Sequence, residues 1–306
     1  MSVSPLQSGD RVLFVADQYA DVARDEVHRY PGGAELTDQA VMEAAPCAVE
    51  TRTFSNFTPR DLDDASVCIV GNAARARPDQ LRVLAEFPRL ILFEHDMRIC
   101  RARGDMSMLR HPLHRALHWC LCRRSEMLEL TKGSAGVVFL TEYQKQIFER
   151  NPWYPRRPMR VLGCSVFDKA TLKKFDAAPV AGDRPIEICL AFSAFRAKGF
   201  AESMAHAKTI ADNPYVIRNL PPEEVLDVFR RSKRFVHKPP SPEWAGRLPV
   251  EARFLGCQVA TNEHVGVALE PWWSLDDEAA LRVVSGAAGR FWRFVDELLA
   301  EGARRD

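Results

Sequence analysis

Several features that would decide a protein's class at once have little or no place in this sequence. No apolar run is long enough to span a bilayer, and the first residues lack the basic and apolar pattern of a secretory signal. Internal repeats and low-complexity tracts are also missing. The 42 Lys and Arg residues almost balance the 41 Asp and Glu residues, so the chain as a whole is not a polyanion binder. These absences favour a soluble globular protein.

Compact cysteine spacings of the kind found in disulfide frameworks are lacking as well. The eight cysteines therefore predict a reducing, cytoplasmic setting. One cluster could supply metal ligands: His111, His114, His118, Cys120 and Cys122. Its C-x-C spacing is unlike that of a zinc knuckle, and a helix with buried thiols is the favoured interpretation, so no metal site is predicted.

What is present is an alternation of apolar segments and helical patterns in both halves of the chain. Strands are predicted at 11–16, 67–71, 90–93, 136–140, 186–192, 234–237 and 257–261. Strands separated by helices indicate parallel sheets in a doubly wound α/β architecture. Periodicity is lost between 175 and 184, which predicts a hinge. We therefore expect an N-terminal domain over 1–178 and a C-terminal domain over 179–306.

The most informative segment runs from Leu220 to Gly266. Within it, Glu243 and Glu251 stand eight positions apart across a loop with Pro and Gly that opens a helix between two predicted strands. Such a loop lies at the carboxyl edge of a parallel sheet, where α/β folds bind phosphorylated ligands. Because carboxylates repel phosphates, these two side chains suit a ligand with phosphate in the middle and hydroxyl groups at both ends. A nucleotide sugar has this layout.

The segment resembles the nucleotide-sugar-binding domain of GT-B glycosyltransferases of the GT4 type, through the E-x7-E spacing and the turn at 262–266. The resemblance implies two Rossmann-like doubly wound domains facing a cleft, with the acceptor bound by the first domain and the nucleotide sugar, the donor, by the second. It also implies transfer of a sugar from a nucleoside-diphosphate sugar to an acceptor hydroxyl, with retention of configuration. No DxD motif suited to a metal–diphosphate site is seen, so we expect metal-independent activity with no cofactor beyond the donor.

The resemblance suggests roles for three residues of the second domain. Glu251, at the helix start, would accept hydrogen bonds from the ribose hydroxyls of the donor. Glu243 would face the transferred sugar and the charge that develops near its anomeric carbon. Gly266 would lie near the donor in the turn after the following strand. The alternative for either glutamate is a carboxylate stabilised by the helix dipole.

The phosphate-binding cations match the family pattern only in part. Lys198 directly precedes a glycine, as the family's lysine does, and would neutralise the diphosphate. The family's arginine stands five residues earlier, where this chain has Ser193. Arg196 could substitute for it, or Lys238 or Arg247 could. The alternative for Arg196 is a solvated charge at a helix start with no role in binding.

Two motifs of the first domain point to the same cleft. Gly32 and Gly33 resemble the family's Gly-Gly-Ala-Glu loop, in which the missing Cβ lets backbone N–H groups approach a diphosphate or a sugar. A polar triplet follows the predicted strand 90–93, and there His95 or Asp96 could orient the acceptor hydroxyl or relay its proton. The alternatives are an ordinary turn and a structural histidine.

The distribution of charge along the chain suggests the class of acceptor. Residues 98–174 hold sixteen Lys and Arg against six Asp and Glu, together with aromatic residues such as Trp153. A basic acceptor domain suggests a phosphate-rich acceptor, either DNA with a hydroxylated (hydroxymethylated) base flipped from the stack or a lipid-linked diphosphate. A solvated basic face is the alternative. Three further hypotheses stay open: a surface glycan acceptor, a non-catalytic binding module of the same shape, and a nucleotide-sugar epimerase.

Overall fold

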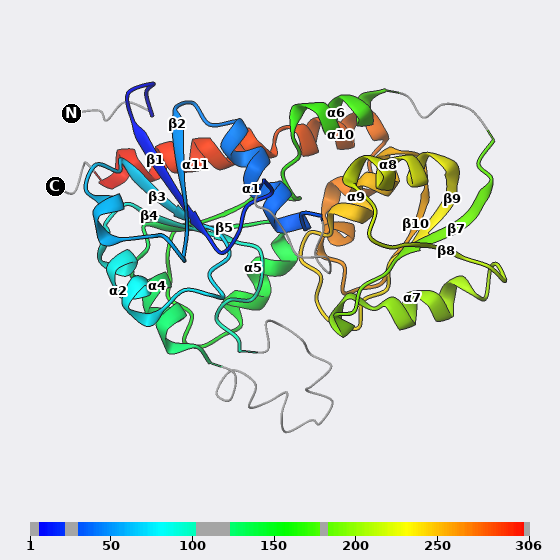
Figure 1. Ribbon diagram of the computed structural model, residues 1–306, viewed down its shortest axis with the longest axis horizontal. Helices are drawn as coiled ribbons and strands as arrows, with labels where there is room; N and C mark the ends of the chain where they lie inside the picture. Colours follow the sequence, from blue (N-terminus) through cyan, green and yellow to red (C-terminus); the bar gives the residue numbers. More distant parts are fainter. Residues whose placement is uncertain (1–5, 22–29, 102–122, 178–182, 303–306) are drawn as a thin grey trace.

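The structure, a computed structural model, describes residues 6–21, 30–101, 123–177 and 183–302. Its strands form two parallel sheets that lie in two lobes side by side (Figure 1). The first sheet has the order β2 (Ala48–Thr53), β1 (Arg11–Ala16), β3 (Val67–Val70), β4 (Leu90–Glu94), β5 (Gly136–Phe139) and β6 (Met159–Val161). The second has the order β10 (Gln258–Ala260), β9 (Ser232–Val236), β7 (Ile186–Ala191) and β8 (Tyr215–Ile217). The predicted α/β architecture with parallel sheets is confirmed.

Helices connect the parallel strands, as such crossovers require. Those of the first lobe are α1 (Gly33–Glu43), α2 (Pro78–Glu86), α4 (Ser125–Gly133) and α5 (Glu142–Glu149), whereas α6 (Lys169–Asp176), which follows β6, packs against α9 and α10 of the second lobe (Figure 1). The helices later in the chain are α7 (Phe200–Ala207), α8 (Pro222–Arg231), α9 (Arg247–Phe254), α10 (Asp277–Ser285) and α11 (Ala287–Gly302). Short 3₁₀ turns lie at Pro59–Leu62, Arg196–Lys198, Gly266–Leu269 and Pro271–Ser274. Among the helices described, none is long and apolar enough to cross a membrane.

The strands in the middle of the first sheet are buried on both faces. Every residue of β3, β4 and β5 is buried, which explains why their sequences read as unbroken apolar runs. Strand β2 differs from these strands, because all of its residues are half-buried or exposed. This edge strand, with the sequence AVETRT, was not predicted, since it lacks an apolar run.

The last helix leaves the second lobe and packs against the first (Figure 1). Phe291 of α11 lies 5.0 Å from the ring of Phe93 in β4, and the Trp292 indole donates to the carbonyl of Val41 in α1 over 2.9 Å. Gly136 allows the close approach, since a Cβ there would come within 2.6 Å of Leu298. The chain thus crosses between the lobes twice. The predicted boundary at 178 lies outside the described residues, and α6 extends into the predicted hinge.

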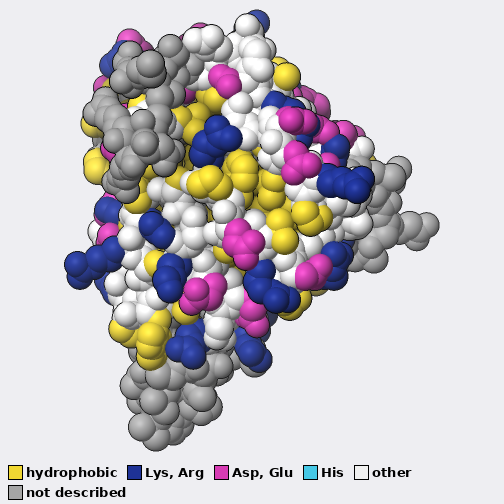
Figure 2. Space-filling view, turned by 90° about the vertical axis from the view of Figure 1, so that its left-hand side faces the viewer, with side chains coloured by type: hydrophobic (Ala, Val, Ile, Leu, Met, Phe, Trp, Pro, Cys, Tyr) yellow, Lys and Arg dark blue, Asp and Glu magenta, His cyan; other side chains and the backbone are white. Residues whose placement is uncertain are grey.

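On the face of the first lobe shown in Figure 2, Lys and Arg side chains lie interspersed with Asp and Glu. Hydrophobic side chains gather near the middle of that face. This view therefore shows no patch of a single charge. Arg98, the first cation of the predicted basic segment, is buried and bonded to Glu94 through Nε and Oε2 at 2.7 Å. It is not available to a surface ligand.

Candidate functional site

The predicted site residues other than Arg196 and Gly266 gather where the two lobes meet. A smaller cavity of about 320 Å³ and a larger one of about 540 Å³ adjoin there. Residues of both lobes line both cavities; the shared ones are Gly32, Gly33, Ser193, Lys198, Glu243, Gly246 and Arg247. Segments more than 200 residues apart in the sequence therefore form one continuous cleft.

The loop that carries Glu243 is fixed by backbone contacts. The N–H of Glu243 donates to the carbonyl of His264, and the carbonyl of Glu243 accepts from the N–H of Gly266, each over 2.8 Å. The Thr141 hydroxyl at the start of α5 donates to the carbonyl of Trp244 over 2.8 Å. A Cβ at Gly266 would come within 2.1 Å of that same carbonyl. Gly266 thus supports the loop from behind and lines neither cavity.

Glu243 and Lys198 form an ion pair at the cleft. The lysine Nζ lies 2.6 Å from Oε2 of the glutamate, whose side chain is 14% exposed. Burial by itself raises the pKa of Glu243, but the Lys198 ammonium and the nearby His237 more than offset this, so that the pKa lies below its usual value. Glu243 is therefore a carboxylate at neutral pH, as its predicted role requires.

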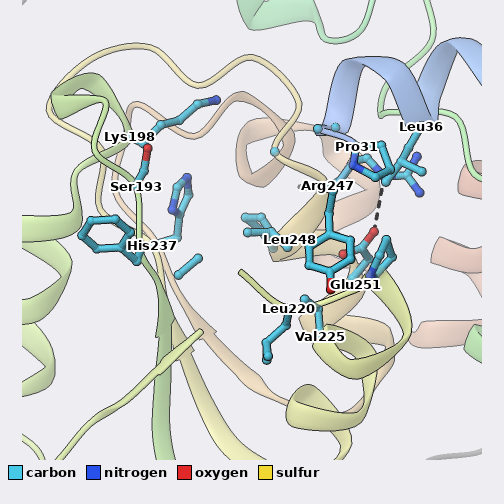
Figure 3. Close-up of a pocket in the computed structure, with 18 of the residues that line it drawn as sticks. Pro31, Leu36, Ser193, Lys198, Leu220, Val225, His237, Arg247, Leu248 and Glu251 are labelled. Atoms are coloured by element: carbon cyan, nitrogen blue, oxygen red, sulfur yellow. Dashed lines mark hydrogen bonds and ion pairs between the residues drawn. The ribbon is translucent and has the colours of Figure 1, made fainter. Parts of the chain in front are cut away.

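The second glutamate is paired in a similar way within α9. Arg247 Nε lies 3.3 Å from Oε1 of Glu251, as the dashed line in Figure 3 marks, and both side chains are almost fully buried. Nη1 of the arginine also donates to the carbonyl of Val166 over 2.6 Å, and the guanidinium lies 4.2 Å from the ring centre of Phe167. Burial raises the pKa of Glu251, and Arg247 offsets part of this rise. Arginine keeps its proton in proteins, so the guanidinium of Arg247 favours the charged form of Glu251.

Glu251 does not head its helix, as the sequence suggested. The helix α9 begins at Arg247, one turn earlier, so Glu251 lies within it and reaches the smaller cavity from there. The helix ends at Phe254, and Gly256 just beyond it adopts a left-handed φ of 83°, as a glycine after a helix end commonly does.

His237 lines the smaller cavity at the end of β9 and was not among the predicted site residues. Its ring lies parallel to that of Phe235, with centroids 6.2 Å apart. Within the described ranges, neither ring nitrogen has a hydrogen-bond partner. Burial lowers the pKa of His237 to about 4, and neighbouring Glu243 offsets only part of the effect, so the ring is neutral at pH 7.

The wall formed by the first lobe holds a second buried histidine. His95, directly after β4, lines the larger cavity beside Asp96. Its Nε2 lies 2.5 Å from Oδ1 of Asp38 in α1, and both side chains are almost fully buried. Burial alone would lower the pKa of His95, but the Asp38 carboxylate outweighs it and the pKa lies above its usual value. Asp38 was missed because nothing in the sequence links it to a residue 57 positions away.

The remaining predicted cations lie apart from the cavities. Arg196 is exposed and lines neither cavity, and Lys238 donates to the carbonyl of Thr261 over 3.0 Å. Ser193, where the family pattern has its arginine, lines both cavities. The structure thus brings Lys198 and Arg247 together at the cleft and leaves Arg196 outside it.

Comparison with known proteins gives matches in structure alone. Neither a family model nor a curated protein sequence matches the chain. The sucrose-phosphate synthase of Thermosynechococcus elongatus aligns with a TM-score of 0.55 and 12% identity over 97% of this chain and 94% of that one. An α-glucosyltransferase in complex with UDP and a 13-mer DNA containing an HMU base aligns with a TM-score of 0.54 and 10% identity over 97% and 95%. The chain has the GT-B fold.

This result confirms the predicted fold class of two Rossmann-like domains facing a cleft. In the GT-B arrangement the carboxyl ends of both sheets point into the cleft, which explains why residues after β4, β7 and β9 meet there. The roles predicted for Gly32, Gly33, Glu243, Glu251 and Gly266 stay predictions. The His and Cys cluster at 111–122 lies outside the described residues, as does much of the basic segment.

Proposed function

We propose that this chain is a glycosyltransferase that moves a sugar from a nucleoside-diphosphate sugar to an acceptor hydroxyl, with retention of configuration and without a metal ion. The observation that carries the proposal is Glu243: a charged carboxylate, paired with Lys198, at the point where both cavities and both domains meet. A carboxylate so placed can stabilise positive charge that develops on a sugar in transit, and the lysine can approach the departing phosphate.

The smaller cavity suits the donor. Its volume of about 320 Å³ lies within the range of small-molecule sites. Apolar side chains form one part of its lining: Leu220, Pro222, Val225, Leu248 and Pro249. Figure 3 shows Leu220 and Val225 at one end and Arg247 with Glu251 to one side. We place the base against the apolar part and the ribose at Glu251, so that the diphosphate extends towards Lys198.

The larger cavity suits the reacting sugar and the acceptor hydroxyl. Gly32 and Gly33 bring the start of α1 to its wall, with His95 and Asp96 alongside. In a retaining transfer the departing phosphate takes the proton of the acceptor hydroxyl. Asp96 and His95 then orient that hydroxyl, and the closed cleft keeps water away from the reacting carbon. The donor is the co-substrate, and no further cofactor enters this scheme.

For the acceptor we favour a hydroxymethylated base in DNA. One GT-B relative in structure is complexed with UDP and DNA that contains an HMU base. On this chain, the described part of the basic segment has an exposed Trp153, 41% accessible, with the Arg123 guanidinium 5.5 Å from its ring centre. An aromatic ring beside a cation is a common contact for nucleic acids.

The test is to incubate the protein with UDP-, GDP- and ADP-sugars, with and without duplex DNA that contains 5-hydroxymethyl bases. Nucleotide release and DNA mass are measured together. A sugar-dependent gain in mass on modified but not on plain DNA supports the whole proposal. Release without DNA modification keeps the donor site and points to a lipid-linked or surface glycan acceptor. A changed nucleotide sugar in the absence of acceptor indicates an epimerase, and acceptor binding without turnover indicates a non-catalytic module.

A further inference from the structure

The charges that line the smaller cavity are already matched to one another. Lys198 is paired with Glu243 at 2.6 Å, and Arg247 with Glu251 at 3.3 Å. Arg247 also donates to a backbone carbonyl. Among the described lining residues, the only other group that can carry charge near neutral pH is His237. While that ring is neutral, each cation of the lining is already in contact with a carboxyl group of the same lining.

A nucleotide sugar would bring two negative charges on its diphosphate into this cavity. Burying such an anion is costly unless positive charge and hydrogen-bond donors meet it. The arginine expected for this purpose is replaced by Ser193, and Arg196 lines neither cavity. The site is therefore short of positive charge by comparison with the pattern that the sequence resembles.

His237 has the position to supply that charge. Its side chain is about nine-tenths buried and lines the cavity at the end of β9. Figure 3 shows it on the same side of the cavity as Ser193 and Lys198. Within the described ranges its ring nitrogens bond to no protein group, so a ring nitrogen is available to a ligand in the cavity.

The charged groups that line the smaller cavity come from three elements. Lys198 lies on the loop after β7, Glu243 on the loop after β9, and Arg247 with Glu251 on α9. The described residues of the first domain that line this cavity bring no carboxylate and no cation; they are Tyr30, Pro31, Gly32, Gly33 and Leu36. An incoming diphosphate would therefore be the largest change in charge that the ring experiences.

We propose that His237 binds the donor's diphosphate by taking up a proton from solvent as the nucleotide sugar enters, so that donor binding and protonation are coupled. This inference rests on the proposed function, since it needs a diphosphate in the smaller cavity. The proton adds to a ring nitrogen, no covalent bond to the donor forms, and the ring becomes a cation that donates to a phosphate oxygen.

The coupling follows from the state of the free protein. Burial holds the pKa of His237 at about 4, and two negative charges beside the ring would raise it. Between the free and the bound pKa, binding consumes protons. Donor affinity is then highest at low pH and falls as the pH rises through the bound pKa.

Titration calorimetry tests the coupling. UDP-glucose is a suitable probe because its diphosphate has no ionisation near neutral pH, and GDP- and ADP-glucose replace it if it does not bind. At pH 6.5, the binding enthalpy is measured in two buffers that differ in ionisation enthalpy. We expect uptake that approaches one proton per bound donor. His237→Asn should abolish the uptake and weaken binding about tenfold, which corresponds to the loss of one charge-assisted contact. His206→Asn, on α7 and away from the cavities, is the control and should retain the uptake.

The outcomes separate the two proposals. Donor binding with no proton uptake by the wild-type protein overturns the role of His237 and leaves the donor site in place. Uptake that persists in His237→Asn also overturns it, because another group then takes the proton. If the asparagine variant does not fold, His237→Gln and the wild-type measurement still decide. If no donor binds, the proposed function fails and the inference fails with it.

Discussion

The two walls of the cleft each hold a buried histidine, and the pKa values of the two are shifted in opposite directions for a reason that can be read from their neighbours. His95 in the first domain has the Asp38 carboxylate at 2.5 Å, and its pKa is raised. Among the described residues no carboxylate bonds to His237 in the second domain, and burial lowers its pKa to about 4. Similar burial thus goes with opposite pKa shifts, because in the described part of the chain only the His95 ring has a hydrogen-bond partner.

The difference shows how each wall acquires its charge. On the first wall the charge is fixed by packing, since Asp38 belongs to α1 and His95 directly follows a buried strand. On the second wall, loops and α9 carry ion pairs, and His237 is left to take up a proton from solvent when a ligand binds. The first wall is therefore preorganised, whereas the second responds to what binds there.

The largest effect expected on the second wall is that of Glu243→Gln. Removing the carboxylate that faces the sugar should lower turnover by about 100- to 1,000-fold, or about 3–4 kcal/mol of barrier, with the fold intact. Steady-state rates of nucleotide release give the number, and circular dichroism checks the fold. Glu263→Gln, an exposed carboxylate on the neighbouring turn, is the matched control and should be unaffected. Normal turnover in Glu243→Gln would remove the proposed catalytic role.

The pH dependence of stability distinguishes the two histidines directly. The folded pKa of His237 is about 4 and its ordinary value is 6.5, so the unfolded chain binds more protons between these values. The contribution of His237 to the free energy of unfolding is complete above pH 6.5. It is lost as the pH falls towards 4, by at most about 3 kcal/mol. Urea unfolding of wild type and His237→Asn at pH 4.5 and 7 measures it. The difference in unfolding free energy between the two proteins should change with pH. A difference that stays constant would contradict a ring that is buried and neutral.

His95 should behave in the opposite way. Its raised folded pKa means that its contribution is complete below pH 6.5 and is lost as the pH rises through the folded value. Asp38→Asn should remove this dependence and cost about 1–3 kcal/mol of unfolding free energy, because one partner of a buried hydrogen bond is changed. Unfolding curves at pH 5.5 and 8 give both quantities. A variant as stable as wild type at both pH values would show that the pair contributes nothing.

The smallest effect concerns the lysine of the second wall. Lys198→Ala should weaken donor binding about tenfold, because one charge-assisted contact to the diphosphate is lost. Calorimetry with the donor identified in the panel measures it. Lys208→Ala, an exposed lysine just after α7, should bind as wild type does. Arg196→Ala should cause a smaller loss than Lys198→Ala, since Arg196 lies outside both cavities; the reverse order would favour the original prediction for the arginine.

Much of the fold could be predicted because local patterns carry it. The predicted strand at 11–16 coincides with β1, and the Thr141 hydroxyl, at a position where helix caps are common, caps α5 by accepting from the N–H of Gln144 over 3.3 Å. Buried parallel strands read as apolar runs, and turn residues bound them. The edge strand β2 lacked such a run and was missed.

The parts of the site that could not be predicted depend on contacts between distant residues. The sequence does not show that Asp38 meets His95, nor that a Cβ at Gly266 would collide with the carbonyl of Trp244. The exposure of Arg196 is equally a result of how its loop turns. Residue types at the edge of a sheet can be predicted from local patterns, whereas pairings and orientations require the folded structure.

The return of α11 to the first domain has a mechanical consequence. The N–H of Leu6 donates to the carboxylate of Asp296 over 2.9 Å, so both ends of the described chain are anchored in one domain. Tension applied at the two ends would load that domain first and pull α11 away from the sheet. The chain enters and leaves the second lobe between these two anchored ends, so the second lobe would bear no force until the first had given way.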